Sequence, residues 1–153
     1  SFGENSGIKL FSPPSVAGYP AYYQEPNFDK NWYTPGTITT RFGLGQKLVV
    51  DWNLYPNIQT NIDTVAYVDY LANQGIYVSD ADELLDEVLQ LFPQQVSVDR
   101  RDLILQIFLL NLSPTNWYFE WLNYQNTGDD TGVRPHLNAL VVSLLSAHEF
   151  QLK

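Results

Sequence analysis

The feature that most constrains this chain is a run of amphipathic helical segments in its second half, each bounded by capping residues. The clearest segment starts at Ser79 or Asp80, whose side chain can cap a helix, and stops before Pro93. Acidic residues come after the cap in the first turn, where the helix dipole favours negative charge. A stripe at helical spacing comes next, formed by Leu84, Leu85, Val88, Leu89 and Phe92. The pattern predicts a helix over residues 80–92.

Two helices are predicted upstream of this segment. The first runs from about Pro35 to Trp52, because apolar residues recur there at helical spacing. The second runs from Ile62 to Gln74, with Asn61 as its cap and Gly75 as its stop. The chain is therefore expected to be helical before the clearest segment as well as after it.

Three further helices are predicted downstream. The segment after Ser97, ending near Leu112, is apolar on nearly all sides beyond its first turn, so we expect it to be the most buried helix. Proline follows directly at residue 114, and an Arg-Pro pair at residues 134–135 opens the last helix. We predict an all-α fold of five or six helices in an orthogonal or bundled array, forming a helical domain over residues 37–153.

Residues 1–36 differ from the rest of the chain in amino-acid composition. They contain five of the nine prolines, which favour irregular backbone. They are also rich in aromatic side chains, so we expect a long irregular segment that packs on the helices as part of one domain. The candidate ligand-binding residues of the chain are Tyr19, Tyr22, Tyr23, Trp32 and Tyr33. These rings fit either a platform for a neutral glycan or, as we prefer, packing against the helices or against another part of the protein.

The amino-acid composition of the chain argues against several kinds of partner and site. The net charge of −9 repels phosphate backbones, so we expect no nucleic-acid partner. The absence of Cys excludes disulfides, thiolate zinc sites, iron–sulfur clusters and cysteine nucleophiles. No apolar run reaches the length of a membrane span, so no membrane insertion is expected. The absence of Met even at position 1 leads us to expect a fragment of a longer protein.

No catalytic residues, metal ligands or cofactor site can be assembled from the sequence. His136 and His148 would point about 120° apart on one helix, and each is expected to face solvent or a helix end. The acidic run over residues 80–87 is expected to be a solvated helix face, not a pair of catalytic carboxylates. Residues 126–132 (Asn-Thr-Gly-Asp-Asp-Thr-Gly) have oxygen ligands but not the order of an EF-hand, so we expect a turn between helices. Gly43-Leu44-Gly45 is too short for a phosphate cradle.

Two segments resemble a known family. Residues 12–20 (Ser-Pro-Pro-Ser-Val-Ala-Gly-Tyr-Pro) resemble the P-P-x-V-x-G-W-P signature of the bacterial domain-of-unknown-function 1800 family, although Tyr19 replaces the usual Trp. Residues 21–28, then Trp32 and residues 37–41, are similar to the segment after that signature in members from Bacteroidetes. Residues 144–151 (Leu-Leu-Ser-Ala-His-Glu-Phe-Gln) resemble the L-L-S-S-P-E-F-Q terminus of the family, with His148 where Pro is common.

The resemblance implies the C-terminal part of a protein about three times longer, mostly helical and usually exported to the periplasm or cell surface. It implies no reaction. Our first expectation is a non-catalytic structural or interaction domain of an envelope-associated protein. Its partner would be the N-terminal part of the same protein, or a further protein. The alternatives are part of an enzyme whose active site lies in that N-terminal region, or a module that binds neutral glycans.

Overall fold

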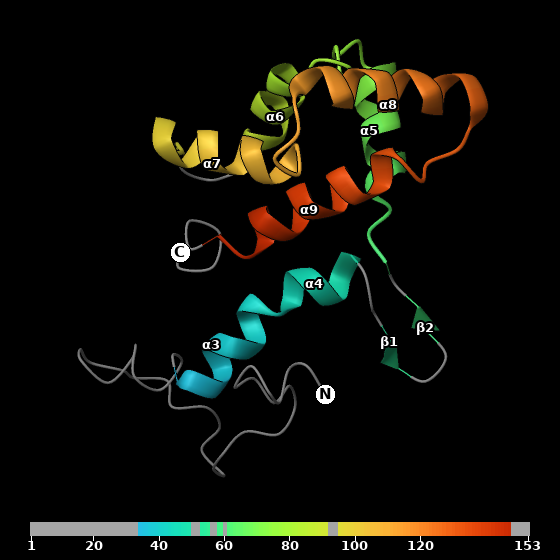
Figure 1. Cartoon of the computed structure of the whole chain (residues 1–153). Helices are drawn as coiled ribbons and strands as arrows, with labels where there is room; N and C mark the ends of the chain where they lie inside the picture. The colour runs from blue at the N-terminus through green and yellow to red at the C-terminus, as the bar shows by residue number, and fades with distance from the viewer. Residues whose placement is uncertain (1–33, 50–52, 56–57, 60, 92–94, 148–153) are drawn as a thin grey trace.

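The computed structural model describes residues 34–49, 53–55, 58–59, 61–91 and 95–147. The predicted all-α class is confirmed, and the ribbon is shown in Figure 1. Seven helices lie in these ranges, or six if α3 and α4, separated only by Gly43, are taken as one bent helix. They are α3 (Pro35–Phe42), α4 (Leu44–Val49), α5 (Thr64–Asn73), α6 (Ala81–Leu89), α7 (Val98–Phe108), α8 (Pro114–Thr127) and α9 (Val133–Leu145).

A two-stranded antiparallel hairpin, which was not predicted from the sequence, follows α4. Strand β1 (Asn53–Tyr55) pairs with β2 (Ile58–Gln59). In the register, Asn53 lies opposite Gln59 and Tyr55 lies opposite Ile58. Strands of three and two residues are too short for apolar alternation to stand out from a single sequence.

Helix starts follow local capping chemistry. Asp80 caps α6 as predicted, because its Oδ1 accepts the backbone N–H groups of Asp82 at 2.9 Å and Glu83 at 3.1 Å. The cap of α5 is Asp63, not Asn61 as predicted, and its carboxylate accepts the amides of the next turn. Helix α3 begins at Pro35, where the first helix was predicted to begin, two residues before the predicted start of the helical domain at residue 37. Proline at the first helical position favours this start, and the Thr34 hydroxyl caps it.

Helix α9 is the central helix of the fold, and it contacts α4, α5, α7 and α8. It crosses beneath α7 and α8 in Figure 1, with α4 on its other side. The prediction that the helix from just after Ser97 to about Leu112 is the most buried one was wrong. Helix α7 buries only Ile104 and Phe108, because it lies at the outside of the array and packs one face on α6 and α9.

The buried core joins α5, α6, α7, α8 and α9. Its largest side chains are Trp117 and Trp121 of α8 and Phe108 of α7, all almost fully shielded from solvent. The rings of Phe108 and Trp117 meet edge to face with centroids 4.8 Å apart. The indole N–H of Trp117 donates to the backbone oxygen of Val78 at 3.0 Å, so both of these buried polar groups have a hydrogen-bond partner.

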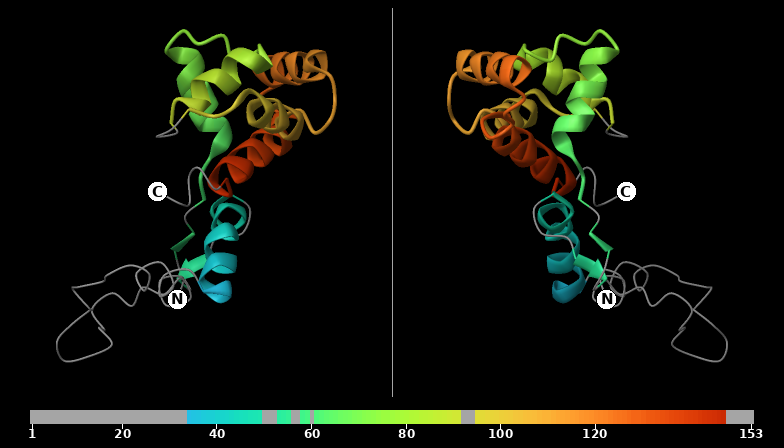
Figure 2. Two further views of the ribbon diagram at one scale, coloured as in Figure 1. Left: turned by 90° about the vertical axis from the view of Figure 1, so that its left-hand side faces the viewer. Right: turned by 90° about the vertical axis from the view of Figure 1, so that its right-hand side faces the viewer.

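Helices α3 and α4 extend away from this core, as Figure 2 shows, and α4 is joined to it through the last turns of α9. The close approach occurs at Gly45, where a Cβ atom would lie only 3.0 Å from the Cβ of Leu145. The hydroxyl of Ser146 donates to the backbone oxygen of Phe42 at 3.2 Å. Gly45 therefore lets the two helix backbones approach closely.

Candidate functional site

The five candidate ligand-binding residues named from the sequence (Tyr19, Tyr22, Tyr23, Trp32 and Tyr33) lie outside the described residues. So do His148 and residues 12–20, which carry the signature-like motif. The candidate surfaces and clusters therefore come from the helical part of the chain.

The acidic face of α6 is exposed, as predicted for the run over residues 80–87, and part of it is paired. Arg101 of α7 donates from Nη2 to Asp82 at 2.9 Å and from Nε to Asp86 at 2.6 Å. The hydrogen bond from Arg101 to Asp86 is the largest cause of the raised pKa of this guanidinium. Exposed ion pairs of this kind contribute modestly, on the order of 0.2–1 kcal/mol each. Their role here is to tie α6 to α7.

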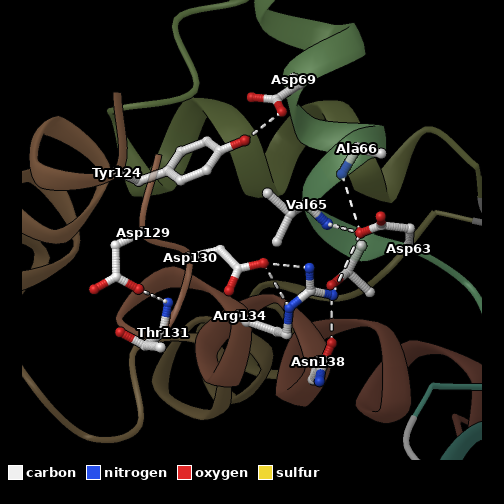
Figure 3. Close-up of polar contacts among 11 residues, drawn as sticks. Asp63, Val65, Ala66, Asp69, Tyr124, Asp129, Asp130, Thr131, Arg134 and Asn138 are labelled. Carbon is white, nitrogen blue, oxygen red and sulfur yellow. Dashed lines mark hydrogen bonds and ion pairs between the residues drawn. The ribbon is translucent and has the colours of Figure 1, made fainter. Parts of the chain in front are cut away.

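A polar cluster at the start of α5 joins this helix to α9 and to the loop before it (Figure 3). Arg134 lies between two aspartates, forming a hydrogen-bonded ion pair with Asp130 and contacting Oδ1 of Asp63 at 3.3 Å. The buried hydroxyl of Thr64 donates to Oδ1 of Asn138 at 2.8 Å. Each member has a partner within the cluster, so the arrangement holds the helix ends in place.

The loop between α8 and α9 is a turn, as predicted. Gly128 ends α8 with a φ of +74°, a left-handed conformation that glycine adopts without strain. Oδ1 of Asp129 accepts the backbone N–H of Thr131 at 3.1 Å, and this bond lowers the pKa of the carboxyl. In the described parts of the chain, no group of three His, Asp or Glu side chains is placed to hold a metal ion.

Tyr124 of α8 completes the link to α5. Its hydroxyl donates to Oδ2 of Asp69 at 2.5 Å. This hydrogen bond, followed by burial, raises the pKa of Tyr124 to about 12. The neutral phenol is therefore favoured in the folded protein, because ionisation would remove the donor and place two negative charges together.

We expect the Tyr124–Asp69 hydrogen bond to make stability depend on pH in the alkaline range. An unfolded tyrosine ionises near 10 and the folded one near 12, so the stabilisation is complete below pH 10. It is lost as the pH rises from 10 through 12. Urea unfolding of the wild-type chain and of Tyr124→Phe across this pH range measures the loss. The other tyrosines are common to both proteins, so the difference between the two free energies of unfolding reports on Tyr124. If the difference in unfolding free energy between the wild type and Tyr124→Phe stays constant with pH, the Tyr124–Asp69 hydrogen bond does not stabilise the fold as described.

His136 is buried in the core, so the expectation that it faces solvent was wrong, but it does meet a helix end, because its partner Phe108 is the last residue of α7. Its Nδ1 lies 2.8 Å from the backbone oxygen of Phe108 and donates to it, because a carbonyl can only accept. The ring lies edge-on to Trp117, with centroids 5.8 Å apart. The periodicity of the last helix places residue 136 next to Leu137 and Leu140, but only the position of α7 beside α9 shows that a carbonyl is there to pair with it.

An exposed apolar stripe runs along α7 and past its end. Leu103 and Ile107 are four residues apart on one helix face, and Leu110 follows after the last turn. Their exposed fractions are 44%, 36% and 41%. We call these three residues the α7 stripe. The sequence shows that this segment is apolar on nearly all sides, but the prediction assigned all of those sides to the core.

A second apolar feature is a hollow of about 240 Å³ between α5, α6 and α9. Its lining residues are Ile62, Tyr67, Val88, Leu91, Val141, Leu144 and Leu145. All but Tyr67 are aliphatic. Sequence periodicity identified Val88, Val141, Leu144 and Leu145 as members of helix stripes, but a hollow depends on how three helices meet.

Within the described ranges, no helix combines the length and the apolar character that crossing a membrane requires. Comparisons with family models, with curated proteins and with solved structures found no match for this chain. Membership of the domain-of-unknown-function 1800 family therefore remains a prediction from the resemblance.

Proposed function

We propose that this chain is a non-catalytic interaction domain that docks through the α7 stripe onto another part of the same, longer protein. The observation that carries the proposal is the stripe itself: two large aliphatic side chains four residues apart on α7 and a third just past its end, each more than a third exposed. Contiguous exposed apolar surface is typical of contact sites. The family resemblance supports the choice of partner and an extracytoplasmic location, the periplasm or the cell surface.

The backbone at Leu110 adds support for a role beyond folding. Helix α7 ends in a Schellman motif, with the Asn111 N–H bonded to the Gln106 oxygen at 2.9 Å and the Leu110 N–H bonded to the Ile107 oxygen at 3.1 Å. Leu110 occupies the left-handed position with a φ of +53°. Glycine is usual there, as at Gly75 after α5, and a leucine costs about 1–2 kcal/mol. A strained, exposed leucine is explained if its side chain makes a contact with a partner.

The proposal is tested by cysteine labelling, because the chain has no Cys of its own. Ile107→Cys places one thiol in the stripe, and Tyr70→Cys places one on an exposed position of α5 as a control. We expect a thiol reagent to label Cys at position 107 at least about tenfold more slowly in the complete gene product than in the 153-residue chain, because the docked partner shields it. Labelling at position 70 should be the same in both. Equal rates at position 107 would refute the proposal.

A variant at Leu110 separates docking from folding. Leu110→Gly removes an apolar side chain but relieves the left-handed strain, so the stability of the isolated chain should change by less than about 1 kcal/mol. In the complete protein, the same variant should restore fast labelling of Cys at position 107. Leu103→Gly, inside the helix, is the matched comparison and should also lower stability by about 1 kcal/mol or more.

A further inference from the structure

The hollow between α5, α6 and α9 lies apart from the α7 stripe, and none of its lining residues belongs to α7 or α8. Ile62, just before α5, and Tyr67, near its start, contribute from one side, and Val88 of α6 and Leu91, just past its end, from another. Val141, Leu144 and Leu145 contribute from the last turns of α9. Three helix ends therefore surround one space, which opens to the surface beside the exposed Leu91.

The side chains that line the hollow determine which kind of ligand it can hold. A cavity lined by aliphatic side chains offers water no hydrogen-bond partners, and cavities of about 150 Å³ with such linings stay dry and take up apolar molecules. The hollow of about 240 Å³ is larger. If a methylene group is taken to occupy about as much space as a liquid water molecule, roughly 30 Å³, the hollow holds a chain of about eight carbons.

An acidic residue of α6 adjoins the hollow, because Glu87 directly precedes the lining residue Val88 and comes four residues before the lining residue Leu91. Tyr67 is the only lining residue with a polar side-chain atom, and burial together with the nearby Glu87 carboxylate raises the pKa of its hydroxyl. Glu87 is half-buried on α6 and accepts a hydrogen bond from Gln90 at 2.9 Å. Among the described residues, no Lys or Arg forms an ion pair with Glu87. An unneutralised carboxylate beside an apolar space attracts a cation and repels an anion.

We propose that this hollow is a binding site for a single aliphatic chain with a cationic end. The chain would lie among the aliphatic side chains of α6 and α9, and the cationic end would lie near Glu87 and the Tyr67 hydroxyl. This site is independent of docking through the α7 stripe, because the two surfaces share no residue.

The test uses three probes with the same eight-carbon chain: octyltrimethylammonium, octanol and octyl sulfate. Each is titrated below its micelle concentration into methyl-labelled protein, and the methyl resonances of Val88, Val141 and Leu144 are followed by NMR. We expect saturable shifts, with octyltrimethylammonium binding tightest and octyl sulfate weakest. Intermolecular contacts between the octyl protons and the Val141 and Leu144 methyl groups should appear in the unaltered protein, so this measurement needs no variant.

Two variants separate the chain from its charged end. Val141→Phe fills the hollow and should abolish binding of all three probes, whereas Val98→Phe, on an exposed position of α7, should leave it unchanged. Glu87→Gln should weaken octyltrimethylammonium at least about threefold while leaving octanol unaffected. The proposal is overturned if no probe gives saturable shifts or contacts at these methyl groups, or if octyl sulfate binds as tightly as octyltrimethylammonium. Binding of octanol alone would likewise overturn the cationic assignment.

Discussion

Replacing Trp117 with alanine is expected to lower the free energy of unfolding by about 5 kcal/mol. Large aromatic-to-alanine changes in a core cost about 3–5 kcal/mol through lost burial and the cavity left behind. The Val78 backbone oxygen would also lose its buried partner, the indole N–H at 3.0 Å, which costs about 1–3 kcal/mol more. Because domains are stable by only about 5–15 kcal/mol, this variant should lie near the limit of folding. Denaturant unfolding followed by circular dichroism measures the change.

The neighbouring residue provides a matched control. Tyr118 follows Trp117 on α8 but is an exposed aromatic, so Tyr118→Ala should cost less than about 1.5 kcal/mol. Trp117→Phe keeps a ring in the core and removes the indole N–H. The free energy of unfolding that it loses should therefore lie between the losses of Trp117→Ala and Tyr118→Ala. If Trp117→Ala and Tyr118→Ala were equally mild, the core arrangement described for α8 would be incorrect.

Replacing Gly45 with valine is expected to loosen α4 from α9 and to cost about 2–3 kcal/mol. A Cβ at this position lies 3.0 Å from the Cβ of Leu145, 3.3 Å from Oγ of Ser146 and 3.3 Å from the Val142 backbone oxygen. Valine adds two methyl groups beyond that atom, and overpacking of this kind costs about 1–3 kcal/mol. The expected result is faster amide hydrogen exchange in α4 and in the last turn of α9, with the rest of the core still protected.

A second helical glycine serves as the control for Gly45. Gly36 is in α3, and a Cβ there would meet nothing within 4 Å. Gly36→Val should therefore change stability by less than about 0.5 kcal/mol and leave amide exchange in α4 as it is. If Gly45→Val leaves exchange in α4 unchanged as well, the close contact between α4 and α9 does not exist in solution.

The sequence by itself determined the helical class and where most helices begin and end. Asp80 and Pro114 mark helix starts, and Gly75 marks a stop, because each acts on its own backbone within one turn. Where two capping residues stand close together, as Asn61 and Asp63 do, the sequence alone did not decide between them. In the structure Asp63 caps α5, and Arg134, brought in from α9, contacts the same carboxylate.

Only the tertiary structure decided which apolar faces are covered. The segment of α7 is apolar around most of its circumference, yet Leu103, Ile107 and Leu110 are exposed because α6 and α9 meet its other side. Periodicity shows which face of a helix carries apolar residues, but it does not show which other helix packs on that face. The burial of His136 against the Phe108 oxygen, the close approach at Gly45 and the apolar hollow each depend on residues from helices distant in sequence. The packing of α9 against four other helices therefore decides these sites, and no local signal encodes it.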